Sequence, residues 1–385
     1  MIKKIIILGN HIQALGVAQI AGRLGVEINL FTDHGLSLAR FSKYCTKTVI
    51  FKNDQDLIEQ ITKLYNDKKD TILMPTNDMM VGFLMENYDT LHNCFFISIP
   101  PKEVTETCFN KILTYKKAEE LGVHFPDSRY PHTLEEALIF SEEIGYPVII
   151  KPAIMFKLFN KVGKKVLPCR TREELVRNYK LAENIIGAKD IIIQRIIGGG
   201  AKNLYSFGSF FVDGKTIGGV VVNRLRQRPM DFGNSTTFAI SVLNKEIENN
   251  AIRFLKGINY CGLSEIEFMW DEEDGTYKLL EINPRTWKWH SITHALEINL
   301  IKMLIDYFEG KDSVPKINQL SNVGWVDPFT DFFIFINCLA RHRIGIKEYI
   351  NSLRIKKEIA IFSKDDMLPT LMYALLLPYI IWRRQ

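Results

Sequence analysis

The segment Glu265–Arg285 constrains this chain more than any other, because it predicts a β-hairpin with charged groups at fixed positions. Two apolar, β-rich runs flank an acidic turn that ends in Asp274-Gly275, a dipeptide typical of tight hairpin turns. Positions 267 and 281 are equidistant from 274, so a symmetric hairpin places Glu267 opposite Glu281. Directly opposed side chains lie about 4.5–5.5 Å apart at Cβ, and two carboxylates there repel each other.

A divalent cation would remove this repulsion. Glu281 and Asn283 are two residues apart, so on a strand both side chains point to the same face. Mg²⁺ prefers oxygen ligands of the kind that Glu267, Glu281 and Asn283 provide, completed by substrate phosphates. The hairpin therefore predicts a magnesium site, in which Mn²⁺ can substitute. A solvated acidic hairpin is the alternative, and it leaves the adjoining Pro284-Arg285 unexplained.

This hairpin resembles the metal-binding signature of a known family. Glu281-Ile-Asn-Pro-Arg285, with Glu267 fourteen residues before Glu281, is similar to the corresponding motif of the ATP-grasp ligases. The likeness is to carbamoyl-phosphate-synthase-like and D-aspartate-ligase-like carboxylate–amine ligases, and it covers residues 1–310. It implies an α/β fold with four parts: a Rossmann-like pre-domain (1–105), an ATP-grasp small lobe (106–195), an ATP-grasp large lobe with the metal site (196–310) and a mostly helical C-terminal extension (311–385).

The N-terminal residues predict a βαβ unit on their own pattern. Residues 5–8 and 26–32 predict two buried strands with a helix between them. This opening lacks a full GxGxxG motif, which weakens a nicotinamide-dependent oxidoreductase as an alternative. A further strand over 71–75 is followed by Asp78, and ligands bind at the carboxyl ends of parallel strands. We expect Asp78 either to cap the next helix or to contact substrate.

Two lysines are expected to bind the ATP phosphates. Residues 110–122 predict an amphipathic helix, and residues 146–152 predict a buried strand. Lys151 follows an apolar run directly, so it needs an anionic partner or a route to water. The family resemblance implies that Lys111 and Lys151 hold the phosphates.

The resemblance also assigns the rest of the nucleotide site. Residues 153–167 match the flexible loop that covers the phosphates, and Lys164 or Lys165 is expected to reach the γ-phosphate. A basic hairpin tip in water is the alternative for this segment. The strand that begins at 190 stands where the family reads adenine through main-chain groups, which implies that the nucleotide site includes Gln194, Arg195 and Ile197.

Arginines supply the remaining candidate catalytic groups. Arg224, Arg226 and Arg228 occupy alternate positions on an extended segment, which predicts that they project to one side. The planar guanidinium suits carboxylates and phosphates. The resemblance implies that Arg226 and Arg228 contact the acceptor or acyl phosphate, with a surface strand as the alternative. It further implies that Arg285 stabilises the transferring phosphoryl group and a later oxyanion.

The C-terminal third carries weaker signals. His290 and His294 are four apart and could share a helix face, but without an HExxH motif we expect packing or a pocket wall rather than zinc. Residues 295–309 predict a helix. Residues 367–384 are mostly apolar but shorter than the roughly twenty residues a spanning helix needs. Docking onto the chain's own core or a dimer partner is expected first, and peripheral membrane contact second.

Length and composition limit the number of domains and the classes of partner that we expect for this chain. A chain of 385 residues is long enough for two or three domains. The net charge of +5 comes with no basic stripe interleaved with aromatic residues, so no nucleic acid partner is expected. Six scattered cysteines without a CxxC pair indicate reduced thiols and a cytoplasmic protein, with the inner face of the membrane as a peripheral location. The N-terminal apolar run is too short for a signal peptide.

These features together predict an ATP-dependent carboxylate–amine ligase. Such an enzyme forms an amide bond through an acyl phosphate and releases ADP and phosphate. Its partners would be a small-molecule carboxylate, an amine and a second copy of the chain in a homodimer. The alternatives are a non-catalytic ATP-binding adaptor at the membrane and the nicotinamide-dependent oxidoreductase.

Overall fold

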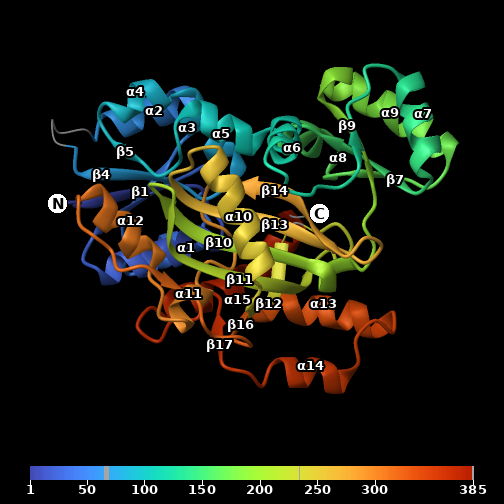
Figure 1. Cartoon of the computed structure of the whole chain (residues 1–385). Coiled ribbons are helices and arrows are strands. Elements are labelled where there is room, and N and C mark those ends of the chain that lie inside the picture. Colours follow the sequence, from blue (N-terminus) through green and yellow to red (C-terminus); the bar gives the residue numbers. More distant parts are fainter. Residues whose placement is uncertain (65–68, 234, 384–385) are drawn as a thin grey trace.

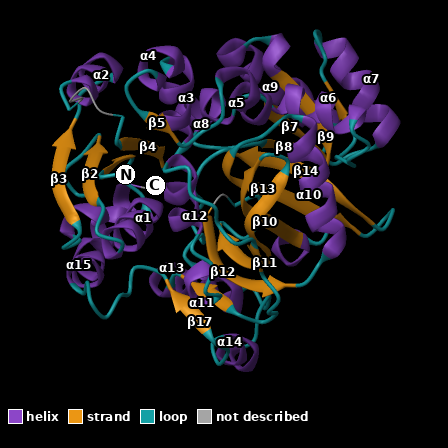
Figure 2. Cartoon of the chain, turned by 60° about the vertical axis from the view of Figure 1, so that its left-hand side comes forward, coloured by secondary structure: helices purple, strands orange, loops and turns teal. Residues whose placement is uncertain are grey.

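The computed structural model describes residues 1–64, 69–233 and 235–383, which are built around three β-sheets (Figures 1 and 2). The first sheet has five parallel strands in the order β3-β2-β1-β4-β5. Its strands are β1 (Lys4–Leu8), β2 (Glu27–Thr32), β3 (Cys45–Ile50), β4 (Thr71–Pro75) and β5 (Phe96–Ile97). Its helices are α1 (Ile12–Arg23), α2 (Asp54–Thr62), α3 (Asp78–Glu86) and α4 (Tyr88–His92). The predicted βαβ opening is confirmed.

The first sheet is buried on both faces. Along β1, Ile5 and Ile7 pack into one apolar cluster while Ile6 and Leu8 pack into another. Successive strand residues point to opposite faces, so a continuous apolar run supplies both layers. Polar residues follow β1 and β4, so they lie at the edge of the sheet formed by the carboxyl ends of these strands.

The second sheet is antiparallel and has the order β6-β9-β7-β8. Helices α5 (Lys102–Phe109) and α6 (Lys111–Glu120) precede it. Its strands are β6 (Ser128–Arg129), β7 (Val148–Pro152), β8 (Leu167–Cys169) and β9 (Ile191–Arg195), and its helices are α7 (Leu134–Ile144), α8 (Met155–Val162) and α9 (Arg172–Ile186). Helix α8 corrects the loop expected at 153–167: Leu158 packs into the core of this lobe, and Gly163 ends the helix in the left-handed conformation.

The third sheet has eight strands in the order β14-β13-β10-β11-β12-β16-β17, with β15 beside β11. Its strands are β10 (Leu204–Val212), β11 (Lys215–Arg228), β12 (Ser235–Val242), β13 (Gly262–Asp271), β14 (Thr276–Asn283), β15 (Lys316–Ile317), β16 (Gly324–Val326) and β17 (Lys357–Ile359). The remaining helices are α10 (Lys245–Gly257), α11 (Ile292–Ala295), α12 (Leu300–Phe308), α13 (Pro328–Ala340), α14 (Ile346–Ser352) and α15 (Leu368–Arg383). The C-terminal extension therefore adds three strands to this sheet as well as helices. The division into four parts remains a proposal.

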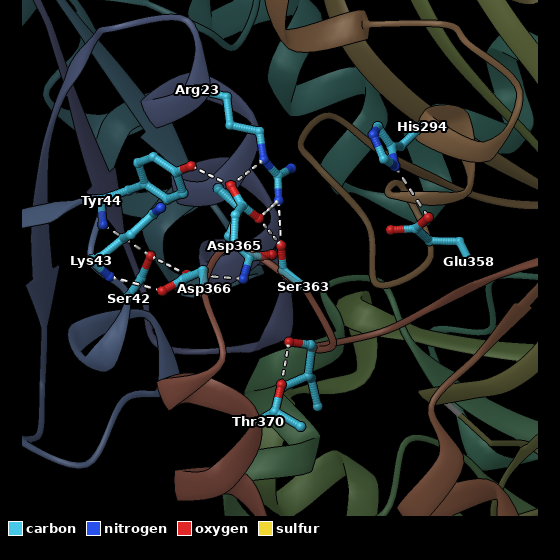
Figure 3. Close-up of polar contacts among 12 residues, drawn as sticks. Arg23, Ser42, Lys43, Tyr44, His294, Glu358, Ser363, Asp365, Asp366 and Thr370 are labelled. Carbon is cyan, nitrogen blue, oxygen red and sulfur yellow. Dashed lines mark hydrogen bonds and ion pairs between the residues drawn. The ribbon is translucent and has the colours of Figure 1, made fainter.

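The C-terminal segment returns to the first sheet (Figure 3). Asp365 pairs with Arg23 at 2.8 Å and accepts a hydrogen bond from Tyr44. Asp366 accepts hydrogen bonds from the Ser42 hydroxyl at 2.6 Å and from the Lys43 main-chain nitrogen at 2.9 Å. Helix α15 follows these contacts and buries Tyr373. The expected docking of the C-terminal segment onto the chain's own core is thus confirmed for its described residues.

The outward side of helix α15 is exposed. Leu371 and Leu375 of α15 are exposed, and the side chains beyond residue 377 lie outside the described part. The last residue of the predicted membrane segment 367–384 also lies outside it. Among the helices that the structure describes, none combines the length and apolar character needed to cross a membrane.

Candidate active site

The predicted pairing of the two hairpin carboxylates is confirmed. Strands β13 and β14 pair with Glu267 directly opposite Glu281, and with Glu265 opposite Asn283. The register shifts by one residue between Glu267 and Phe268, so the pairs nearer the turn are offset by one residue from the pair of Glu267 and Glu281. The three predicted metal-ligating residues therefore share one end of the hairpin.

Glu265 is a fourth member of this group that sequence reasoning missed. Its carboxylate accepts hydrogen bonds from Trp289 Nε1 at 2.7 Å and from Asn283 Nδ2 at 3.2 Å. Burial, reinforced by the neighbouring Glu267 carboxylate, raises the pKa of Glu265 to about 7. The signal was available, because Glu265 and Glu267 are two apart on one strand and so share a face.

The donor set fits Mg²⁺. Burial beside the Glu267 carboxylate raises the pKa of Glu265, so positive charge is favourable here, and the amide oxygen of Asn283 is a ligand that Mg²⁺ accepts. Within the described ranges, no three His, Cys, Asp or Glu side chains converge closely enough to hold a metal without other help. Mg²⁺ sites take one or two carboxylates and complete their coordination with water and substrate phosphates.

Three cations face the two carboxylates. Lys111 Nζ lies 3.1 Å and Lys165 Nζ 3.9 Å from the oxygens of Glu281, and Arg224 pairs with Glu267. Burial acts to raise the pKa of Glu281, but these lysines outweigh it and hold that pKa well below its usual range. The site thus holds interleaved charges of both signs.

Of the lysines expected at the phosphates, Lys151 and Lys165 line the larger cavity. Lys151 Nζ donates to Gln194 Oε1 at 2.8 Å, and Gln194 in turn donates to Ser128 Oγ at 2.8 Å. Lys165 lines the same cavity, whereas Lys164 is exposed and lies outside its lining. The end of α8 at Gly163 sets which of the two neighbours turns inward.

A cavity of about 350 Å³ unites most of the predicted nucleotide site. Its apolar wall includes Ile149, Leu204, Met269 and Leu280, which suits a flat apolar ring. Six predicted nucleotide-site residues also line it: Lys151, Gln194, Arg195, Ile197, Glu267 and Glu281. Lys111 and Asn283 line a smaller neighbouring cavity together with Asp78 and Glu281.

Arg195 lines the cavity, but its guanidinium forms ion pairs with three carboxylates. It pairs with Asp127 and Glu273 at 3.0 Å each, and with the buried Asp271. These carboxylates come from the linker before β6 and from the hairpin turn. Arg195 therefore ties β9 to the hairpin of β13 and β14.

The prediction that three arginines project together is wrong. The pairing of β11 with β12 is irregular on both sides of Arg226, which breaks the two-residue alternation. Arg224 reaches Glu267, while Arg226 is buried and bonded to both oxygens of Asp331 at 2.8 Å each. Arg228 is half-buried opposite Ser235, in the stretch that leads to the cavity.

Arg285 lies where the first sheet meets the hairpin. Its Nε donates to Asp78 Oδ1 at 2.6 Å, and its Nη2 donates to Asn283 Oδ1 at 3.2 Å. Asn77, not Asp78, caps helix α3 by accepting from the Met80 main-chain nitrogen, so the capping expectation for Asp78 is wrong. Asp78 instead orients Arg285 from a position at the carboxyl edge of the first sheet.

The two histidines do not share a helix face. His290 is buried in the turn before α11, where its Nδ1 contacts the Trp287 carbonyl at 2.8 Å, and burial lowers its pKa to about 4. Its ring lies so close to α1 that a Cβ at Gly16 would fall 2.6 Å from it. His294 is exposed and contacts Glu358 at 3.3 Å. The packing role predicted for this region is confirmed for His290.

Comparison with known protein families agrees with this geometry. The model of the carbamoyl-phosphate synthase L chain ATP-binding domain matches residues 110–202 and 220–307. D-aspartate ligase of Enterococcus faecium (strain Aus0004) is 26% identical over 306 residues, which are 73% of this chain and 70% of that protein. Biotin carboxylase 1 of Bacillus subtilis (strain 168) is 24% identical, over 63% of this chain and 56% of its own length.

Solved structures share the fold. N5-carboxyaminoimidazole synthetase from Staphylococcus aureus, complexed with ADP, has a TM-score of 0.65 at 15% identity and is matched over 83% of this chain and 80% of that one. A biotin carboxylase complex from Campylobacter jejuni has a TM-score of 0.64 at 20% identity, over 81% and 72% of the two chains. At these identities the likeness concerns the fold.

Proposed function

The chain belongs to the ATP-grasp ligases, and we propose that it joins a small-molecule carboxylate to an amine through an acyl phosphate. A carboxylate acylates amines poorly, because its leaving group would be oxide. Transfer of the γ-phosphoryl group of ATP to the carboxylate supplies a better leaving group. The amine then attacks the acyl carbon, a C–N bond forms, and phosphate departs while ADP is released.

One observation carries the proposal: cations and carboxylates converge at one cavity that also has an apolar wall. Lys165, Lys151 and Glu281 line this cavity, and Lys111 reaches Glu281 from the smaller cavity beside it. Phosphoryl transfer depends mainly on positioning and on neutralising charge, and this arrangement supplies groups for both.

The roles follow from position. Lys111 and Lys151 would hold the phosphates, and Lys165, rather than Lys164, would approach them from the end of α8. Glu267, Glu281 and Asn283 would hold Mg²⁺ or Mn²⁺, which neutralises charge on the phosphate oxygens when bound.

Arg285 is the group we assign to the reacting atoms. Its ion pair with Asp78 fixes the direction of the guanidinium, and its side chain has little contact with solvent. A preoriented cation can stabilise the transferring phosphoryl group and then the oxyanion of the tetrahedral intermediate. Arg228 would contact the acceptor or acyl phosphate, while Arg226 has a structural role that its pairing with Asp331 supports.

The proposed location is cytoplasmic, and a homodimer is the proposed assembly. A structurally similar biotin carboxylase domain from Hydrogenobacter thermophilus is described as a dimer. Residues 367–384 stay a proposed peripheral contact with the membrane.

A non-catalytic adaptor would bind ATP without turnover, and the complete set of charged groups favours the ligase over it.

The deciding experiment measures Mg²⁺-dependent release of ADP and phosphate with pooled amino acids and carboxylic acids. We expect release by the wild type and none by Glu281→Ala. Glu272→Ala, an exposed acid on the turn of the same hairpin, is the matched control and should retain activity. ATP binding without release in every pool would favour the adaptor, and failure to bind ATP would refute the proposal.

A further inference from the structure

The outward face of helix α13 lacks charged residues. Phe332, Phe333 and Ile336 are each about half exposed, at 50%, 49% and 46%. Asn337 and Ala340 complete this face. A helix on the surface of a globular protein normally turns charged and polar side chains outward. An apolar face of this kind on a folded domain marks a contact with a partner.

The neighbouring helix α14 carries two more exposed apolar residues. Phe335 of α13 stacks on Tyr349 of α14 with ring centroids 3.9 Å apart, so the two helices are neighbours (Figure 1). Ile346 and Ile350 lie one turn apart on α14 and are exposed at 58% and 46%. We call Phe332, Phe333, Ile336, Ile346 and Ile350 the α13–α14 surface.

Positive charge accompanies this surface. From residue 341 to residue 357 the chain contains six lysines and arginines and a single acid, Glu348. Arg341, Lys347, Arg354 and Lys356 are exposed. Arg343 pairs with Asp231 at 2.9 Å. Among the described residues, the other four exposed cations form no ion pair. The partner of this surface therefore has to accept both apolar side chains and cations.

The positive charge distinguishes between two possible partners of this surface, a second copy of the chain and a membrane. A second copy bound by this surface across a two-fold axis would bring the same cations face to face, which is unfavourable. An anionic bilayer accepts phenylalanine and isoleucine at the acyl boundary and cations at its headgroups. We propose that the α13–α14 surface binds the protein peripherally to an anionic lipid membrane.

This proposal does not rest on the ligase reaction, and it concerns a different element from the 367–384 contact. The ion pair between Arg226 and Asp331 anchors α13 to β11, and Arg226 also donates to Ser352 of α14. The two helices are thus held to the large sheet as one unit. Membrane binding would need no rearrangement of the active site.

The test is sedimentation of the full-length protein with vesicles of phosphatidylcholine alone or mixed with phosphatidylserine. We expect binding to the mixed vesicles that weakens with salt. The triple change Phe332→Ser, Phe333→Ser and Ile336→Ser should weaken it by more than roughly tenfold. Lys347→Gln and Arg354→Gln should each weaken it by roughly fivefold.

Matched variants separate the surface from the tail and from misfolding. Leu371→Ser with Leu375→Ser changes two equally exposed residues of α15 and should leave binding unchanged. Ile346→Ser with Ile350→Ser is a second variant of the surface itself. Circular dichroism and ADP release without vesicles should be unaltered in every variant, which distinguishes loss of membrane binding from loss of the enzyme.

Four results would overturn the proposal. The wild type could fail to bind mixed vesicles, or the α15 variant alone could lose binding, which would move the contact to 367–384. A dimer of the wild type that the triple variant abolishes would make the surface an interface between copies. Binding to soluble polyglutamate that matches vesicle binding, and is insensitive to the phenylalanine changes, would indicate an acidic macromolecule.

Discussion

Arg226→Met is expected to destabilise the protein while leaving phosphoryl transfer intact. The guanidinium donates two hydrogen bonds of 2.8 Å to Asp331 and a third of 3.0 Å to Ser352. Asp331 is fully buried, and Thr237 Oγ1 donates to it at 2.9 Å. The pair therefore joins β11 and β12 to both α13 and α14, far from solvent.

The magnitude follows from what the substitution leaves behind. Without the guanidinium, the Asp331 carboxylate stays buried with little besides Thr237 to bond it, and removing one partner of a buried pair costs about 3–5 kcal/mol. Arg226 also lies 4.1 Å from the centroid of the Phe238 ring, a contact worth about 1 kcal/mol. We expect a loss of about 5 kcal/mol, or roughly 10–20 °C in Tm for a cooperative unit of about 150–250 residues. Combining Arg226→Met with Asp331→Leu should recover much of it.

The assay compares two arginines of one strand. Urea unfolding followed by tryptophan fluorescence measures stability, and ADP release at saturating ATP measures chemistry. Arg228→Met is the matched control, because the described residues provide Arg228 with no ion pair; its stability should hold while ADP release falls. An unchanged urea midpoint in Arg226→Met, together with a hundredfold or greater loss of kcat, would show that Arg226 acts on the reacting groups and refute this reasoning.

Three further predictions concern single side chains. Lys165→Met should raise KM for ATP by about tenfold or more, because a charged hydrogen bond is lost, whereas Lys164→Met should stay within about twofold in the same steady-state assay. Asp78→Asn should lower kcat with little change in KM for ATP, since it frees Arg285 to rotate; an equal rise in KM would indicate a binding role. The contribution of His290 to stability should fall by about 3 kcal/mol between pH 6.5 and pH 4, because the unfolded state binds a proton that buried His290, with its pKa of about 4, does not. Glu265, with its pKa of about 7, contributes with the opposite sign, so the measurement is the difference between wild type and the His290 variant. His290→Gln should flatten that slope in urea titrations, and an unchanged slope would exclude His290 as its source.

The hairpin could be predicted because its signals are local. The turn at Asp274-Gly275 fixes which residues oppose each other, and the two-residue period fixes which face they share. The pairing of Glu267 with Glu281 agrees with that prediction, although a one-residue register shift separates it from the pairs nearest the turn. The same holds for β1, whose uninterrupted apolar run has few solutions other than a buried parallel strand.

The arginines of β11 could not be sorted in this way. An alternating pattern predicts a common side only while the ladder is regular, and irregular pairing around Arg226 is not visible in the sequence. Its partner, Asp331, lies 105 residues later in a segment without a motif. Lys164 and Lys165 were indistinguishable because they are neighbours after Gly163, where α8 ends, and only the fold shows that Lys165 lines the cavity.

The charges at the hairpin show why the motif alone is insufficient. Glu265, Glu267 and Glu281 crowd one end of β13 and β14, and such a group of carboxylates costs stability unless cations compensate it. Arg224 and Lys111 provide that compensation from two other elements. In the proposed cycle, Lys111 also binds phosphate, so one side chain stabilises the site before ATP arrives and the phosphates afterwards. A motif identifies the carboxylates, but only the fold identifies the cations that make them compatible with a folded protein.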